Sequence, residues 1–166
     1  MTYTIIIRGP LGVGKSTIAK ILKEKLSADH YQMDSVIEEN NLDDEGEDGF
    51  IKEDNLLKAN EILIPKIEET LKSKIVIIDG CFYRKSQLDH LVNNIAHEVI
   101  VFTLKASLDS CKHRDKHRDY SYGEDAAFVV YNITTKFDYG IIIDTENQSV
   151  EDTIEEIVSY LPTIHS

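Results

Sequence analysis

A run of nine residues near the start of the chain has the composition of a phosphate-binding loop. Residues 9–17 read Gly-Pro-Leu-Gly-Val-Gly-Lys-Ser-Thr. Glycines allow successive backbone N–H groups to point into one concavity and hold phosphate oxygens. Lys15 would bridge the β- and γ-phosphates of a nucleoside triphosphate, and the Ser16 hydroxyl would ligate Mg²⁺. The residues that we expect to contact the nucleotide are Gly9, Leu11, Gly12, Val13, Gly14, Lys15, Ser16 and Thr17.

Two carboxylates follow apolar segments at places that suit catalysis. Asp79 ends the run Ile-Val-Ile-Ile-Asp, and we predict that it holds Mg²⁺ together with Ser16. An Asp before a glycine is also an ordinary turn residue. Asp34 ends Tyr-Gln-Met-Asp, where a second strand would end, and could orient or deprotonate the hydroxyl of a phosphoryl acceptor. The alternative is that Asp34 caps a helix that starts at Ser35, and the two roles are compatible.

A cationic cluster lies between Lys105 and Arg118, where five Lys or Arg residues stand against two Asp. Arg114 and Arg118 are four residues apart, so on a helix they reach the same side. Guanidinium groups suit the oxygens of a phosphoryl group in transfer. We therefore predict that Lys15, Arg114 and Arg118 stabilise the transferred group. The alternative for this cluster is a solvated helix face.

Strands alternating with helices must position these groups. Continuous rather than alternating hydrophobicity predicts parallel strands covered on both faces. Helical patterns lie between them, one with Pro65 inside it and one with Ser149 and Asp152 spaced as a capping box. The order predicts a three-layer α/β/α fold with a parallel sheet of about five strands. The expected strands are residues 3–7, 75–78, 99–103 and 141–143, and the expected helices include residues 18–26, 56–71 and 150–161.

Composition narrows the class of protein. The 166 residues suit one domain, and a net charge of −12 argues against a general nucleic-acid binder. No apolar run approaches the roughly 20 residues that span a membrane, no cationic leader precedes the first strand, and the two cysteines suit a reducing compartment. We therefore expect a cytoplasmic protein. Residues 38–54 hold nine acidic residues and one lysine, which predicts either a solvated mobile connection or a mobile cover over an acceptor site.

The glycine-rich loop and the Asp-Gly strand end resemble those of the small P-loop kinases, the group of adenylate kinase, shikimate kinase, gluconate kinase, adenylylsulfate kinase and chloramphenicol phosphotransferase. The resemblance implies a P-loop nucleoside triphosphate hydrolase fold, ATP as the donor and a small helical lid, here about residues 112–124. Residues 107–120 look like the lid entry of adenylylsulfate kinases. Residues 79–87 look like the Asp-Gly-Phe-Pro-Arg segment of adenylate kinases, which implies that Arg84 grips a phosphate of the acceptor. Arg84 could instead merely begin a helix.

These features together predict a Mg²⁺-dependent kinase that transfers the γ-phosphoryl group of ATP to a small-molecule acceptor. The acceptor would be a nucleotide, a sugar or another hydroxylated metabolite, and the protein a monomer or a homodimer. One alternative is a kinase for polynucleotide 5′-hydroxyl ends, against which the acidic residues 38–54 argue. The other is a nucleoside triphosphate-dependent switch or ATPase without an acceptor, against which the absence of a guanine-reading N-K-x-D motif argues.

Overall fold

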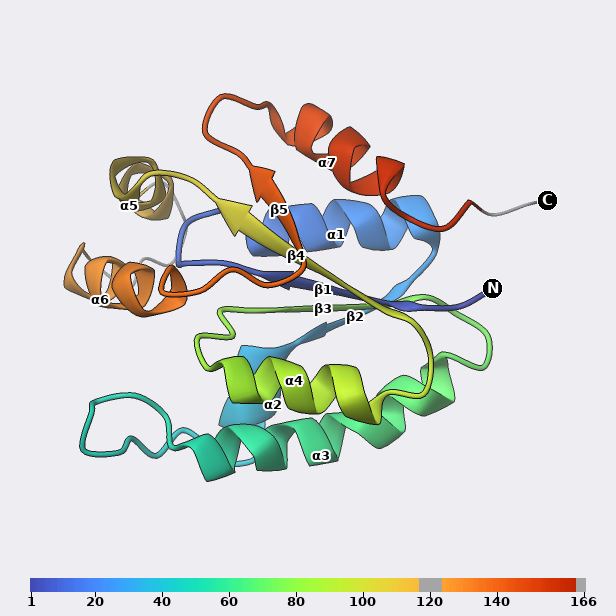
Figure 1. Ribbon diagram of the computed structural model, residues 1–166, viewed down its shortest axis with the longest axis horizontal. Helices are drawn as coiled ribbons and strands as arrows, with labels where there is room; N and C mark the ends of the chain where they lie inside the picture. The colour runs from blue at the N-terminus through green and yellow to red at the C-terminus, as the bar shows by residue number, and fades with distance from the viewer. Residues whose placement is uncertain (117–123, 164–166) are drawn as a thin grey trace.

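A five-stranded parallel sheet forms the centre of the computed structural model, which describes residues 1–116 and 124–163 (Figure 1). The strand order is β2-β3-β1-β4-β5, and the predicted three-layer α/β/α fold is confirmed. All residues of β1 and β3 are buried, which accounts for their continuous hydrophobicity. The strands are β1 (Thr4–Arg8), β2 (Asp29–Gln32), β3 (Val76–Gly80), β4 (Val99–Lys105) and β5 (Ile141–Asp144).

Helices cover both faces of the sheet and its carboxyl edge (Figure 1). On one face lie α1 (Lys15–Leu26) and α7 (Val150–Ser159), and on the other α2 (Met33–Glu39), α3 (Glu53–Thr70) and α4 (Lys85–Asn94). At the carboxyl ends of the strands lie α5 (Leu108–Lys116) and α6 (Glu124–Thr134). Each face has its own cluster of buried apolar side chains. No helix among residues 1–116 and 124–163 is long and apolar enough to cross a membrane.

Most element boundaries lie close to those that the sequence predicts. Pro65 lies inside α3, and the Ser149 hydroxyl accepts a hydrogen bond from the Asp152 N–H, 3.1 Å away, at the start of α7. The second strand differs, because it ends at Gln32 and the buried Met33 already begins α2. Asp34 therefore lies in the first turn of a helix and not at the end of a strand.

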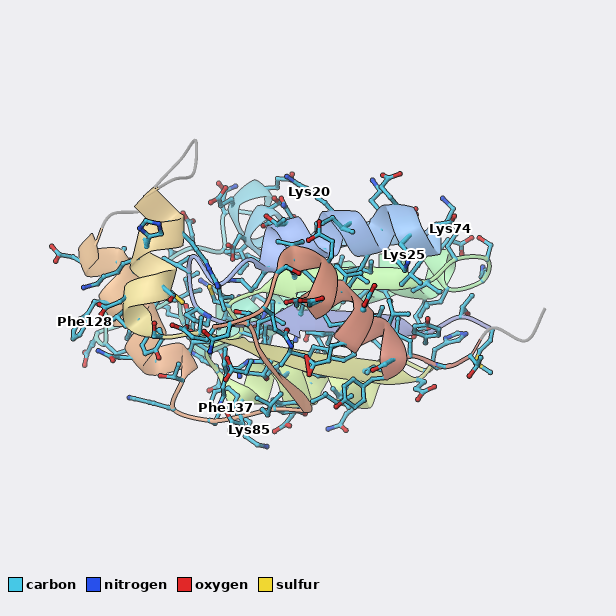
Figure 2. All side chains as sticks on the ribbon, turned by 90° about the horizontal axis from the view of Figure 1, so that it is seen from above. Lys20, Lys25, Lys74, Lys85, Phe128 and Phe137 are labelled. Carbon is cyan, nitrogen blue, oxygen red and sulfur yellow. The ribbon has the colours of Figure 1, made fainter. Side chains whose placement is uncertain are left out.

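A fully buried arginine joins the loops at the carboxyl edge. Arg8 ends β1, and its guanidinium donates hydrogen bonds to the carbonyl oxygens of Thr134 (2.8 Å) and Phe82 (3.4 Å). The guanidinium also lies 4.3 Å from the centre of the Phe137 ring, which is labelled in Figure 2. Burial lowers the pKa of Arg8 to about 10, which still leaves it charged at neutral pH. Arg8 thus fixes the segments after β3 and α6 against the strand that leads into residues 9–17.

Candidate active site

A cavity of about 660 Å³ opens at the carboxyl edge of the sheet, and residues 11–18 form its floor. Residues 32–38 contribute to the wall on the β2 side, and residues 145–153 to the wall on the β5 side. The sheet order places β2 and β5 at opposite edges with β1 between them. The segment after β1 therefore lies at the middle of the cavity.

The backbone of residues 9–17, hereafter the P-loop, has the conformation that its glycines predict. Gly12 has φ +79° and Gly14 has φ +109°, values that other residues rarely adopt. A Cβ on Gly12 would lie 2.1 Å from the Cys111 carbonyl oxygen, so glycine is also required for the close packing of α5 on the loop. Residues 11–17 line the cavity, whereas Gly9 is buried beneath it, where a Cβ would lie 2.9 Å from the Leu104 carbonyl oxygen.

Lys15 and Ser16 occupy the first turn of α1, where unpaired backbone N–H groups and the helix dipole favour a bound anion. Both residues line the cavity. The Lys15 Nζ donates a hydrogen bond to the Pro10 carbonyl oxygen, 2.8 Å away, and is half-buried. The ammonium group is therefore already held over the loop that it would serve.

Asp79 lies on the cavity wall next to this first turn and is 6% exposed. Its Oδ2 pairs with Nε2 of His30, a residue of the neighbouring strand β2. This pairing with His30 orients the Asp79 carboxylate at the cavity wall. Ser16 and Asp79, the two predicted Mg²⁺ ligands, are thus brought to one cavity as a hydroxyl and a carboxylate, which are oxygen donors that Mg²⁺ prefers.

Asp34 also faces the cavity, from the first turn of α2. Asp34 is exposed on the cavity side, and the protein atoms around it still raise the pKa of its carboxyl group above the usual value, chiefly by desolvation. Lys15 opposes this rise, whereas the negative charges of Asp79 and Glu38 add to it. A carboxylate with a raised pKa is a better proton acceptor than an ordinary surface Asp.

Arg114 lies on α5 at the β5 side of the cavity. Its guanidinium donates to the Val13 carbonyl oxygen (3.2 Å), to the Thr145 hydroxyl (3.1 Å) and to the Thr145 carbonyl oxygen (3.1 Å). Arg114 thus ties the P-loop to the segment between β5 and α7. Arg118, the second arginine of the predicted cluster, lies outside the described residues, as does most of the predicted lid.

Arg84 does not line the cavity. Its Nε and Nη2 donate to the Ile51 carbonyl oxygen at 3.1 and 3.0 Å, and Nη2 also pairs with Asp48 at 3.0 Å. The Tyr83 hydroxyl accepts from the Ile51 N–H, 3.1 Å away. Arg84 and Tyr83 therefore fasten the acidic segment of residues 38–54 to the start of α4.

Several residues of the site lie outside the predicted set, among them Gln32, Glu38 and His30. Gln32 and Glu38 line the cavity, and His30 pairs with Asp79. Gln32 and His30 reach the site through the register of β2 against β3, which places Gln32 opposite Asp79. Strand register is a tertiary property, so the local pattern of the sequence could not identify them. The four-residue spacing of Asp34 and Glu38 was the available signal for Glu38.

The fold and the P-loop define a P-loop nucleotide-binding protein. A family model described as "AAA domain" matches residues 5–153. A shikimate kinase of Actinobacillus succinogenes is 30% identical, over 97% of this chain and 96% of the relative. Two solved structures share the fold. A gluconokinase from Sinorhizobium meliloti has a TM-score of 0.71 at 17% identity, with 94% of this chain and 89% of that chain covered. The Mycobacterium tuberculosis APS kinase has a TM-score of 0.65 at 13% identity, with 95% and 96% covered.

The chain therefore belongs to the family described as "AAA domain" and to the small P-loop kinases. It is a phosphotransferase enzyme, as the sequence predicts.

Proposed function

We propose that the protein is a Mg²⁺-dependent kinase that transfers the γ-phosphoryl group of ATP to a hydroxyl group of a small molecule. The observation that carries this proposal is that one cavity holds both halves of the required machinery. Lys15 and Ser16 line it from the P-loop, and Asp34 faces them from α2. Because all three residues line the same cavity, a phosphoryl group held at the P-loop and an acceptor held at Asp34 would lie in one enclosed space.

The donor side fits a nucleoside triphosphate with its metal ion. The P-loop N–H groups and Lys15 would bind the phosphates, and Ser16 and Asp79 would hold Mg²⁺. The metal ion supplies charge neutralisation at the β- and γ-phosphate oxygens when it is bound. Arg114, fixed by Val13 and Thr145, would position the nucleotide on the β5 side. Arg118 would stabilise the charge of the transferred group.

The acceptor side fits a hydroxyl group. Asp34 would accept a hydrogen bond from this hydroxyl and orient its oxygen towards the γ-phosphorus. The bond between the γ-phosphorus and the β,γ-bridging oxygen breaks, and a bond forms between the γ-phosphorus and the acceptor oxygen. The hydroxyl proton passes to Asp34 and then to water, which leaves ADP and a phosphate monoester. Residues 112–124 would act as the lid and residues 38–54 as the cover of the acceptor side, both within one domain of residues 1–166.

The charge around the cavity supports a small molecule over a polynucleotide. A polynucleotide end would bring several phosphates, which require Lys and Arg contacts. Instead, residues 38–54, which begin at the cavity-lining Glu38, carry nine acidic residues and one lysine. Arg84, which contacts this segment, is already paired with Asp48.

The test is ADP release with Mg-ATP across a panel of nucleosides, nucleoside monophosphates, sugars, hydroxy acids and amino alcohols, together with a 5′-hydroxyl RNA. Stimulation by a small-molecule class, and its loss in Lys15→Ala, is the expected result. Stimulation only by the RNA would establish the polynucleotide kinase instead. ADP release that no acceptor stimulates, but that Lys15→Ala abolishes, would establish an ATPase and overturn the proposal.

A further inference from the structure

We infer that the acceptor is a hydroxylated compound that carries a cationic amino group and no anionic group, and that Glu38 selects it. This inference rests on the proposed kinase function and adds the charge of the acceptor to it. It follows from how charged side chains are distributed along the cavity.

The position of the P-loop divides the cavity into two sides. The nucleotide phosphates bind at the middle, after β1, and Arg114 and Thr145 mark the β5 side. Asp34, the residue that faces Lys15, comes from the β2 side. The acceptor must therefore occupy the β2 side, because its hydroxyl has to meet Asp34 and the γ-phosphoryl group together.

Among the described residues, those that line the β2 side are neutral or acidic. Gln32 and Ser35 are neutral, and Asp34 and Glu38 are carboxylates. Among the residues that the structure describes, the cations that line the cavity are Lys15 and Arg114. Lys15 is required by the phosphates, and Arg114 lies on the β5 side. An anionic acceptor would meet two carboxylates here, which is unfavourable.

Four other basic side chains, on or next to α1 and α4, do not line the cavity. The guanidinium of Arg84 is bonded to Ile51 and Asp48 in the acidic segment. Lys20 and Lys25 of α1 are exposed and do not line the cavity; Figure 2 labels both on that helix. Lys85 pairs with Asp89 within α4 at 2.8 Å. None of these four side chains is placed to neutralise a carboxylate or phosphate of an acceptor.

The spacing of the two carboxylates indicates where an amino group would bind. Asp34 and Glu38 are four residues apart on α2, so they share a face, about 6 Å apart along the helix axis. Their mutual repulsion contributes to the raised pKa of Asp34. An ammonium group at Glu38 would offset this repulsion and form a charge-assisted hydrogen bond, while a hydroxyl of the same molecule reaches Asp34. An amino sugar or an aminocyclitol spans such a distance.

Acceptors of similar size that differ in charge test the inference. The first set is glucosamine, glucose and glucuronate, and the second is 2-deoxystreptamine, myo-inositol and shikimate. In kcat/KM for ADP release with Mg-ATP, we expect the amino member of a set to exceed its neutral member about tenfold, and the anionic member to be poorest. An anionic best acceptor overturns the inference and leaves the kinase function standing. If only neutral or anionic compounds of the wider panel are phosphorylated, the inference falls and the kinase function stands, whereas if no compound of the panel is phosphorylated, both fall.

A single substitution isolates the role of Glu38. We expect Glu38→Gln to raise KM for the amino acceptor about tenfold and to lower about tenfold the ratio of kcat/KM for the amino acceptor to kcat/KM for its neutral partner. Glu39→Gln is the matched control, because Glu39 is exposed on the same helix and does not line the cavity. Thermal unfolding of both variants checks that they are folded. An equal loss for the amino and neutral acceptors would overturn the assignment of Glu38.

Discussion

The two sides of the cavity differ in how their residues are held. On the β5 side and at the middle, the P-loop is one continuous segment that packs against the α5 backbone and is bonded to Arg114. On the β2 side, side chains from β2 and α2 face the cavity, and the neighbouring acidic segment is fastened through Arg84 and Tyr83. The donor side is therefore fixed by backbone geometry, and the acceptor side by charged side chains. We therefore expect substitutions on the donor side to reduce stability and activity strongly, and substitutions on the acceptor side to change substrate specificity.

The largest expected effect is at the centre of the donor side. We expect Lys15→Ala to lower kcat by roughly 100- to 1000-fold, because it removes a preorganised cation from the transferred group. Steady-state ADP release at saturating Mg-ATP measures it. Lys20→Ala, on an exposed position of the same helix, is the control. A kcat of Lys15→Ala equal to that of the control would remove Lys15 from the mechanism.

The next largest effect is on the acceptor side. We expect Asp34→Asn to lower kcat about 100-fold, because the acceptor hydroxyl loses its proton acceptor. In the unsubstituted enzyme, protonation of Asp34 removes the base, so kcat/KM for the acceptor should fall as pH decreases through the raised pKa of Asp34. A pH–rate profile measures this. If the Asp34→Asn variant keeps the acidic limb of the pH–rate profile, another group is the base.

Backbone substitutions compare the rigidity of the two sides directly. We expect Gly12→Ala to reduce the free energy of unfolding by about 1–3 kcal/mol, because its Cβ would strike the Cys111 carbonyl oxygen at 2.1 Å and its φ is +79°. Gly49→Ala has a similar φ of +78° but no atom within 4 Å of the Cβ, so it should cost less. Urea unfolding measures both. A larger loss for Gly49→Ala would contradict the comparison.

The smallest effect is expected at Arg84. Arg84→Ala removes the bonds to Ile51 and Asp48, so we expect a loss of about 1 kcal/mol in unfolding free energy and little change in acceptor KM. If Arg84 instead gripped a phosphate of the acceptor, as the resemblance to adenylate kinases implies, acceptor KM would rise about tenfold or more. Steady-state kinetics with the best acceptor of the panel separate the two roles.

The sequence predicts the donor side more completely than the acceptor side. The P-loop is local, so its glycines, Lys15 and Ser16 define both its conformation and its chemistry. The apolar strands, and from them the fold, follow from hydrophobic patterns that are also local. By contrast, His30 reaches Asp79 only through the pairing of β2 with β3, and Arg84 reaches Ile51 across 33 positions of the chain. Such contacts depend on the packed structure, which is why local sequence patterns could predict neither of them.

The most direct test of phosphoryl transfer between the two sides is the identity of the product. The purified protein is incubated with Mg-ATP and the best acceptor, and the products are followed by ³¹P NMR. We predict ADP and an acceptor phosphate monoester in equal amounts, both formed roughly 100- to 1000-fold more slowly by Lys15→Ala. ADP and inorganic phosphate in equal amounts, without any ester, would show that water is the acceptor and would contradict the account.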